Sequence, residues 1–248
     1  RFYMVGYTAR QYRLDGYPMA NLIGHRGQKF EVDVVSTFLP CAVVESLYAV
    51  VSRLGLEVSS LTLEPIASLN AAIPEDIRLL NLVLADIGAG TSDLAVCREG
   101  SVVGYTMATV AGDEITEALM KGLLVDFKTA ERLKLQLGGK EPQPYSDVLG
   151  MKHEATPEEL WGLARPAAQK LAKEIGQKVI ELNGGPPSAV FLAGGGSKLR
   201  GLPQLVAEEL EMSEGRVALA GRHFETSAYA EGQDLEDPEL ATPLGIAV

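Results

Sequence analysis

The stretch Asp86-Ile87-Gly88-Ala89-Gly90-Thr91-Ser92-Asp93 decides how the rest of the chain is interpreted. It lies between two short apolar runs, residues 81–86 and 94–97, and both are typical of buried strands. The pattern predicts a strand, a turn rich in glycine and hydroxyl groups, and a second strand.

Such a turn suits a phosphate chain, which has to lie close to backbone amides. Gly88 and Gly90 lack side chains that would block the approach, and they tolerate positive φ. Thr91 and Ser92 add hydroxyl donors, and Asp86 at the strand end is placed to hold Mg²⁺ through water. The alternative is an ordinary glycine-rich hairpin turn, but the flanking strands and the two aspartates favour a phosphate site.

A second glycine-rich segment is Gly194-Gly195-Gly196-Ser197, between a strand predicted over 188–193 and a helix predicted over 203–210. Three glycines allow a flat base to lie directly on the backbone. A tight loop between strand and helix explains the same residues without a ligand. The spacing of a dinucleotide-binding fingerprint is not met.

Glu131 and Lys134 lie three residues apart on a helix predicted over 129–137. They share one face of that helix, where they can bracket a ribose and base. A solvated ion pair on the surface is the ordinary alternative.

Glu64, followed by Pro65, precedes the phosphate turn by about twenty residues. A carboxylate near a γ-phosphate can orient a water molecule for attack. A turn at a strand end explains the Glu-Pro pair equally well.

Hydrophobic periodicity predicts the remaining elements. Strands are expected over 2–5, 29–35, 61–63 and 101–107, and helices over 43–54, 65–72, 157–182, from 112 and from 242. Residues 140–155 are expected to form a loop or small edge elements, and the acidic residues 225–239 are expected to form a loop. A strand meander followed by alternating helices and strands indicates a mixed α/β sheet with helices on its faces.

Composition limits the classes of function. The 248 residues include 33 acidic and 22 basic side chains, for a net charge of -11. So acidic a chain is a poor nucleic-acid binder, because phosphate contacts need Lys and Arg. No cluster of Cys and His suggests a metal, and no apolar run is long enough to span a membrane.

The order of these motifs resembles the actin, sugar kinase and heat-shock chaperone superfamily. Residues 86–93 are similar to its phosphate-2 hairpin, and 192–198 (LAGGGSK) to its adenosine loop. Residues 130–134 are similar to its AE-x-x-K helix, and 64–67 to its EPxAA segment.

Within that superfamily the sequence resembles the FtsA family of bacterial cell division proteins, from about residue 10 to the end. The segments that carry this resemblance are 15–27, 63–68, 110–113 and 241–245. PilM, a pilus-assembly relative, is the near alternative. The resemblance adds Ala89 and Gly112 to the expected nucleotide-binding residues and gives Glu64 and Asp86 catalytic roles.

The resemblance implies an α/β fold: an actin-like ATPase (ribonuclease H-like) domain with a mixed five-stranded sheet flanked by helices, plus part of an extra α+β subdomain. The expected division is 1–38 for the extra subdomain (1C), 39–80 for the end of subdomain IA and the connection, 81–122 with 156–248 for subdomain IIA, and 123–155 for subdomain IIB. A phosphate-1 region is expected to precede Arg1, so the sequence is expected to be part of a longer protein.

The resemblance also implies ATP and Mg²⁺ as ligands, slow hydrolysis in the complete protein, and self-association into actin-like filaments. FtsZ is the expected partner, in the cytoplasm at the inner face of the membrane, with membrane contact only through a segment absent here. A PilM-like role in pilus assembly, a metabolite kinase of the same superfamily and a scaffold that does not hydrolyse ATP are the alternatives.

Overall fold

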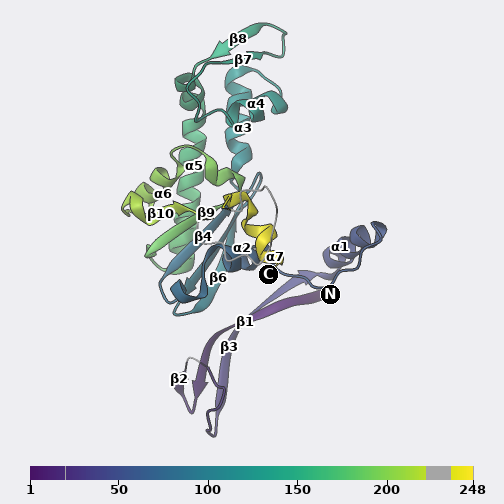
Figure 1. The fold of residues 1–248 in the computed structure, drawn as a ribbon, viewed down its shortest axis with the longest axis vertical. Coiled ribbons are helices and arrows are strands. Elements are labelled where there is room, and N and C mark those ends of the chain that lie inside the picture. Colours follow the sequence, from purple (N-terminus) through teal and green to yellow (C-terminus); the bar gives the residue numbers. More distant parts are fainter. Residues whose placement is uncertain (20, 222–235, 248) are drawn as a thin grey trace.

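The computed structural model describes residues 1–19, 21–221 and 236–247. Figure 1 shows a central sheet with a long helix on it, a smaller part above, and a narrow ribbon of strands that projects below. The residues predicted to contact a ligand all lie outside the N-terminal ribbon.

The central sheet has five strands in the order β10-β9-β4-β5-β6. The expected antiparallel meander is formed by β4 (Leu82–Ile87), β5 (Ser92–Arg98) and β6 (Ser101–Ala108). β9 (Ala189–Ala193) pairs in parallel with β4, and β10 (Val217–Leu219) pairs in parallel with β9. The prediction of a mixed sheet flanked by helices is confirmed.

Alternate residues of β4 enter two separate cores, as the two-residue period of a strand requires. Val83, Ala85 and Ile87 face the larger core, and Leu82 and Leu84 face the smaller one. The larger core is covered by α3 (Gly112–Leu123), α4 (Phe127–Lys134), α5 (Pro157–Asn183) and α6 (Leu202–Glu209). The smaller core is covered by α2 (Glu64–Ala72) and by α7 (Ala241–Ala247).

Helix α5 begins where the sequence predicts it. The Thr156 hydroxyl accepts from the Glu159 amide, and the Glu159 carboxylate accepts from the Thr156 amide. This reciprocal cap satisfies two amides at the helix start. Pro166 lies inside the helix, which ends at Gly184 with φ of 78°.

Above the sheet, residues 140–155, expected as a loop or small edge elements, contain a hairpin of β7 (Gln143–Ser146) and β8 (Lys152–Ala155). Asp147 organises its turn, because its Oδ1 accepts from the amides of Leu149 and Met151. The division of the chain into subdomains stays a prediction.

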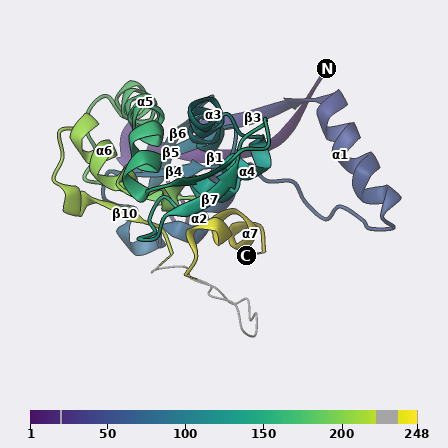
Figure 2. The same cartoon turned by 90° about the horizontal axis from the view of Figure 1, so that it is seen from above.

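The N-terminal ribbon consists of β1 (Phe2–Leu14), β2 (Tyr17–Met19) and β3 (Phe30–Pro40). It leads into α1 (Cys41–Arg53), which Figure 2 shows standing apart from α5 and α6. Helix α1 has the predicted apolar periodicity, but Val44 is its one buried residue.

One predicted strand is wrong. Residues 61–63 form no strand, because the Leu63 carbonyl accepts from the amides of Ile66 and Ala67 and so begins α2.

Four short 3₁₀ segments complete the described elements, at Glu75–Ile77, Gly195–Lys198 (η2), Glu214–Arg216 and Pro238–Leu240 (η4). Most of the acidic tail expected as a loop lies outside the described residues. Within the described residues, no helix combines the length and apolar character needed to cross a bilayer.

Helices α2 and α7 cross at very close range. An alanine at Gly245 would bring its Cβ to 1.8 Å from the backbone oxygen of Ala67. We expect Gly245→Ala to lower the free energy of unfolding by about 1–3 kcal/mol, because the helices would have to separate. Urea denaturation measures the change.

Gly162→Ala in α5 is the matched control, since nothing lies within 4 Å of a Cβ at that position. The control should raise the free energy of unfolding, by up to about 1 kcal/mol, because alanine favours the helix. Equal destabilisation by the two variants would contradict the close crossing.

Candidate functional site

The two glycine-rich loops and helix α4 meet around one cleft with a volume of about 400 Å³. Its walls come from the β4–β5 turn, the start of α3, helix α4 and the segment after β9. The predicted residues that line it are Gly88, Ala89, Gly112, Glu131, Lys134, Gly195 and Gly196. Residues from four separate parts of the sequence therefore share one cavity.

The β4–β5 turn offers free backbone donors beside this cleft. Residues 88–91 are exposed, and the Gly88 amide closes the turn by donating to Thr91 O at 2.9 Å. The Gly88 and Ala89 carbonyls accept from the first amides of α3, at Gly112 and Asp113. Within the described part of the chain, the amides of 89–91 make no hydrogen bond. They are thus available to an anion.

The hydroxyl groups of two predicted residues are committed elsewhere, which corrects the expectation of direct ligand contact. Ser92 Oγ is buried and donates to Val110 O at 2.8 Å, so it does not point at a phosphate. Ser197 Oγ is buried and donates to Gly194 O at 2.7 Å, closing the turn of η2. Both hydroxyls stabilise the loops rather than line the cleft.

The glycines after β9 are required by the packing of the protein itself. Gly194 has φ of 77°, and a Cβ there would lie 2.5 Å from both Asp86 Oδ1 and Ile87 O. A Cβ on Gly196 would lie 2.4 Å from Ile87 Cγ2. The tight-loop alternative therefore accounts for Gly194, whereas Gly195 and Gly196 also line the cavity.

Glu131 and Lys134 form a partly enclosed pair rather than a solvated one. Lys134 Nζ lies 2.8 Å from Glu131 Oε2, and its side chain is only 17% exposed. Thr116 Oγ1 donates to the same carboxylate oxygen at 2.7 Å. Burial alone would raise the pKa of Glu131, but the hydrogen bonds from Lys134 and Thr116 outweigh it and hold that pKa below its usual value. The Glu131 carboxylate is therefore held in its charged form, and Lys134 lies beside it in the cavity wall.

Three carboxylates gather at the end of the sheet on the side of α2. Asp86 and Asp93 are paired across β4 and β5, and Glu64 begins α2. Burial raises the pKa of Glu64, and the charges of Asp86 and Asp93 raise it further, although a hydrogen bond from Thr242 opposes them. Burial and the charge of Asp86 raise the pKa of Asp93 in the same way. Among the described residues, no salt bridge involves any of these three carboxylates.

Carboxylates such as these fit a water-mediated Mg²⁺ ion. Among the described residues, no three His, Cys, Asp or Glu side chains come close enough to form a complete metal site. Mg²⁺ does not need one, because it keeps several waters and uses one or two carboxylates together with substrate phosphates. Asp86, 8% exposed, is the carboxylate that we expected in this role.

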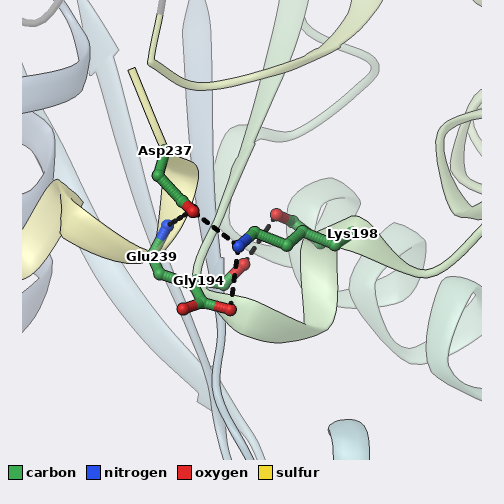
Figure 3. A network of polar contacts seen from close by, with 5 residues as sticks. Gly194, Lys198, Asp237 and Glu239 are labelled. Atoms are coloured by element: carbon green, nitrogen blue, oxygen red, sulfur yellow. Dashed lines mark hydrogen bonds and ion pairs between the residues drawn. The ribbon is translucent and has the colours of Figure 1, made fainter. Parts of the chain in front are cut away.

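An ion-pair network that the sequence did not predict borders the cleft. Figure 3 shows the Lys198 ammonium between the carboxylates of Asp237 and Glu239, beside Gly194. The distances are 2.7 Å to Asp237 Oδ2 and 3.0 Å to Glu239 Oε1. The network joins η2 to η4, and both Lys198 and Glu239 line the cavity.

Other lining residues were also missed, namely Ile115, Leu135, Leu137, Gly138, Leu199 and Arg200. Most are apolar and carry no motif. Arg200, two residues after the Lys of the second loop, was the one visible signal.

A known protein family matches the part of the chain that forms this cleft. The family model described as "Cell division protein FtsA" covers residues 83–245, which include both glycine loops and α4. The chain belongs to the FtsA family.

Individual relatives agree with that assignment. The chain is 27% identical over 212 residues to the cell division protein FtsA of Pseudomonas aeruginosa, which covers 77% of this chain and 48% of that protein. It is 31% identical over 112 residues to FtsA of Bacillus subtilis, and this match covers 45% of this chain and 26% of that protein. The chain thus spans half or less of the length of these curated FtsA relatives.

Solved structures show that this FtsA-family chain has the actin-like ATPase fold. The PilM-PilN type IV pilus biogenesis complex matches with a TM-score of 0.72 and 21% identity, over 100% of this chain and 65% of that one. MreB5 of Spiroplasma citri bound to ADP matches with a TM-score of 0.63 and 21% identity, over 84% and 65%.

The raised pKa values of Glu64 and Asp93 predict a stability that depends on pH. A raised pKa means that the folded chain binds the proton more tightly than the unfolded chain does. The free energy of unfolding contributed by this tighter binding is present at acid pH and is lost as pH rises through the folded pKa. We expect Asp93→Asn to raise the free energy of unfolding at pH 7, by roughly 0.5 kcal/mol because solvent screens this half-buried group.

The gain from Asp93→Asn should disappear below the usual Asp pKa of 3.8, where the wild-type group is also neutral. Urea denaturation at several pH values measures it, with the exposed Asp76 in an Asp76→Asn control. Destabilisation by Asp93→Asn at pH 7 would contradict the charge arrangement.

Proposed function

We propose that this chain forms part of an ATP–Mg²⁺ site. The observation that carries the proposal is the group of free, exposed amides at 89–91 beside a cleft that also holds the Lys134 ammonium. Backbone donors with a lysine are a recurrent way to hold phosphates.

Each part of the cleft has a role in this proposal. The turn from Gly88 to Thr91 holds the phosphates, and Gly112 lets the start of α3 approach them. Glu131 and Lys134 flank the ribose. Gly195 and Gly196 lie against the base, together with apolar lining such as Leu199.

Mg²⁺, when bound, neutralises charge on the phosphates. Asp86, near the end of β4, would hold it through water. Two hydroxyl groups donate to one oxygen of this carboxylate, Oδ2, and so fix its position. Glu64, at the start of α2, would orient a water molecule, and we expect slow hydrolysis at most.

We further propose that the protein acts as FtsA-type proteins are expected to act. Nucleotide binding would favour actin-like filaments that tether the FtsZ ring, in the cytoplasm at the inner face of the membrane. Membership of the FtsA family supports this role over the alternatives. The similarity to the PilM-PilN complex is one of fold, and PilM-like pilus assembly remains the second candidate.

Gly88→Arg tests the phosphate assignment. An arginine side chain at this exposed position of the turn would occupy the space in front of the free amides, so we expect no measurable ATP binding by isothermal titration calorimetry. Gly162→Arg, at an exposed site in α5, adds the same side chain away from the cleft and should leave the affinity unchanged. Unchanged affinity in Gly88→Arg would refute the assignment.

Lys134→Ala tests the ribose and phosphate side of the cleft. Loss of one charge-assisted hydrogen bond should raise the dissociation constant for ATP about tenfold. Lys128→Ala removes an exposed lysine from the same helix and should have no effect. Equal affinities for these two variants would remove Lys134 from the site.

The cellular role needs separate assays. Co-sedimentation with FtsZ polymers in the presence of ATP would support the FtsA-type role, and its absence would favour the pilus-assembly alternative. Turnover of a small-molecule phosphate acceptor would instead indicate a metabolite kinase.

A further inference from the structure

Three oxygen atoms from three elements meet behind the β4–β5 turn. Asp86 Oδ2 on β4 lies 2.6 Å from Ser68 Oγ on α2 and 2.9 Å from Thr242 Oγ1 on α7. The two hydroxyl oxygens are themselves 2.6 Å apart. Because Ser68 is fully buried and Asp86 is 8% exposed, water does not readily replace a lost partner here.

Both hydroxyl oxygens of this triangle lie within hydrogen-bonding distance of the same carboxylate oxygen, Asp86 Oδ2. Each hydroxyl has one proton to donate, whereas an ionised carboxylate only accepts. Thr242 Oγ1 also lies 3.5 Å from Glu64 Oε1, so two hydroxyl protons are shared among four contacts. Asp86 Oδ2 is the carboxylate oxygen that both hydroxyls reach. Asp86 Oδ1 accepts no hydrogen bond from any residue that the structure describes, so it remains able to accept from a metal-bound water.

The same two hydroxyls sit at the crossing of α2 and α7. Ser68 follows Ala67, whose carbonyl faces Gly245 at the closest point of the crossing. Thr242 lies three residues before Gly245, so both are on one face of α7. A shift of either helix would therefore move a hydroxyl that holds Asp86.

We propose that Ser68 and Thr242 are positioning residues for the Mg²⁺ carboxylate. They hold Asp86 Oδ2 so that Oδ1 stays free for the hydration shell of Mg²⁺–ATP, and they tie that carboxylate to the α2–α7 crossing. The inference rests on the proposed ATP–Mg²⁺ site and extends it to residues that make no contact with the nucleotide cleft.

The test compares the dissociation constant for ATP in EDTA with that in Mg²⁺, for the same chain. Thr242→Val keeps the shape but removes the hydroxyl, Thr242→Ser keeps the hydroxyl, and Ser68→Ala removes the second one. Ser46→Ala is the control, since Ser46 is an exposed serine that bonds only within α1. Melting temperatures without ligand report any loss of stability separately.

We expect Thr242→Val and Ser68→Ala to reduce the Mg²⁺-dependent gain in affinity about tenfold, as loss of partners behind a metal ligand does, with the affinity in EDTA unchanged. Thr242→Ser and Ser46→Ala should keep the full gain. Binding of Mn²⁺ in the presence of ATP, followed by electron paramagnetic resonance, should weaken in the same two variants.

A full Mg²⁺-dependent gain in both hydroxyl-deleted variants would overturn the inference, whatever their melting temperatures. A wild-type chain that binds ATP with no gain from Mg²⁺ would overturn it while leaving ATP binding intact. A wild-type chain that binds no ATP in either buffer would overturn the proposed function and the inference together. Should Thr242→Val not fold, Ser68→Ala against Ser46→Ala still decides between the outcomes.

Discussion

The parallel pairing of β4 with β9 is the constraint on which the site depends. The carboxyl ends of parallel strands lie at the same edge of a sheet, so the turn after Ile87 and the loop after Ala193 must lie side by side. These loops are more than one hundred residues apart in the sequence. No local sequence motif brings the two loops together. The pairing of Asp86 on β4 with Ala193 on β9 does so.

The same pairing explains why glycine follows β9. Gly194 lies against Asp86 and Ile87 so closely that any side chain would push the strand ends apart. A glycine that appears suited to a ligand can therefore be required first by the protein's own backbone. At Gly90 nothing lies within 4 Å of a Cβ, so the packing of the protein imposes no such demand there.

The sequence was sufficient for elements with strong local signals. The meander after residue 81, the capped helix from Pro157 and the strand before Gly194 all formed as expected. The sequence predicts a loop or small edge elements over 140–155 but does not specify the hairpin, because its turn is built by the Asp147 carboxylate, which no hydrophobic period reveals.

Long-range contacts explain what local signals left out. A hydroxyl group near a glycine turn can donate either to a ligand or to the backbone. The folded chain decides between the two, because Ser92 donates to the Val110 carbonyl and Ser197 to the Gly194 carbonyl. The bonds from Lys198 to Asp237 and Glu239 span about forty residues of sequence and leave no periodic trace. Most of the apolar lining of the cleft is likewise indistinguishable from core in the sequence.

Different polar groups lie on the two sides of the sheet edge, and this bears on how a nucleotide would be held. The amides of 89–91 and the Lys134 ammonium lie toward α3 and α4, whereas Glu64, Asp86 and Asp93 gather toward α2. A polyphosphate drawn to the first side would be repelled by the second, because like charges in partly buried surroundings are weakly screened. A divalent cation bound between the phosphates and the carboxylates would turn this repulsion into attraction. In the proposed site, phosphate affinity would therefore depend on the metal through the carboxylates, and a residue that orients Asp86 would contribute to nucleotide binding without touching the nucleotide.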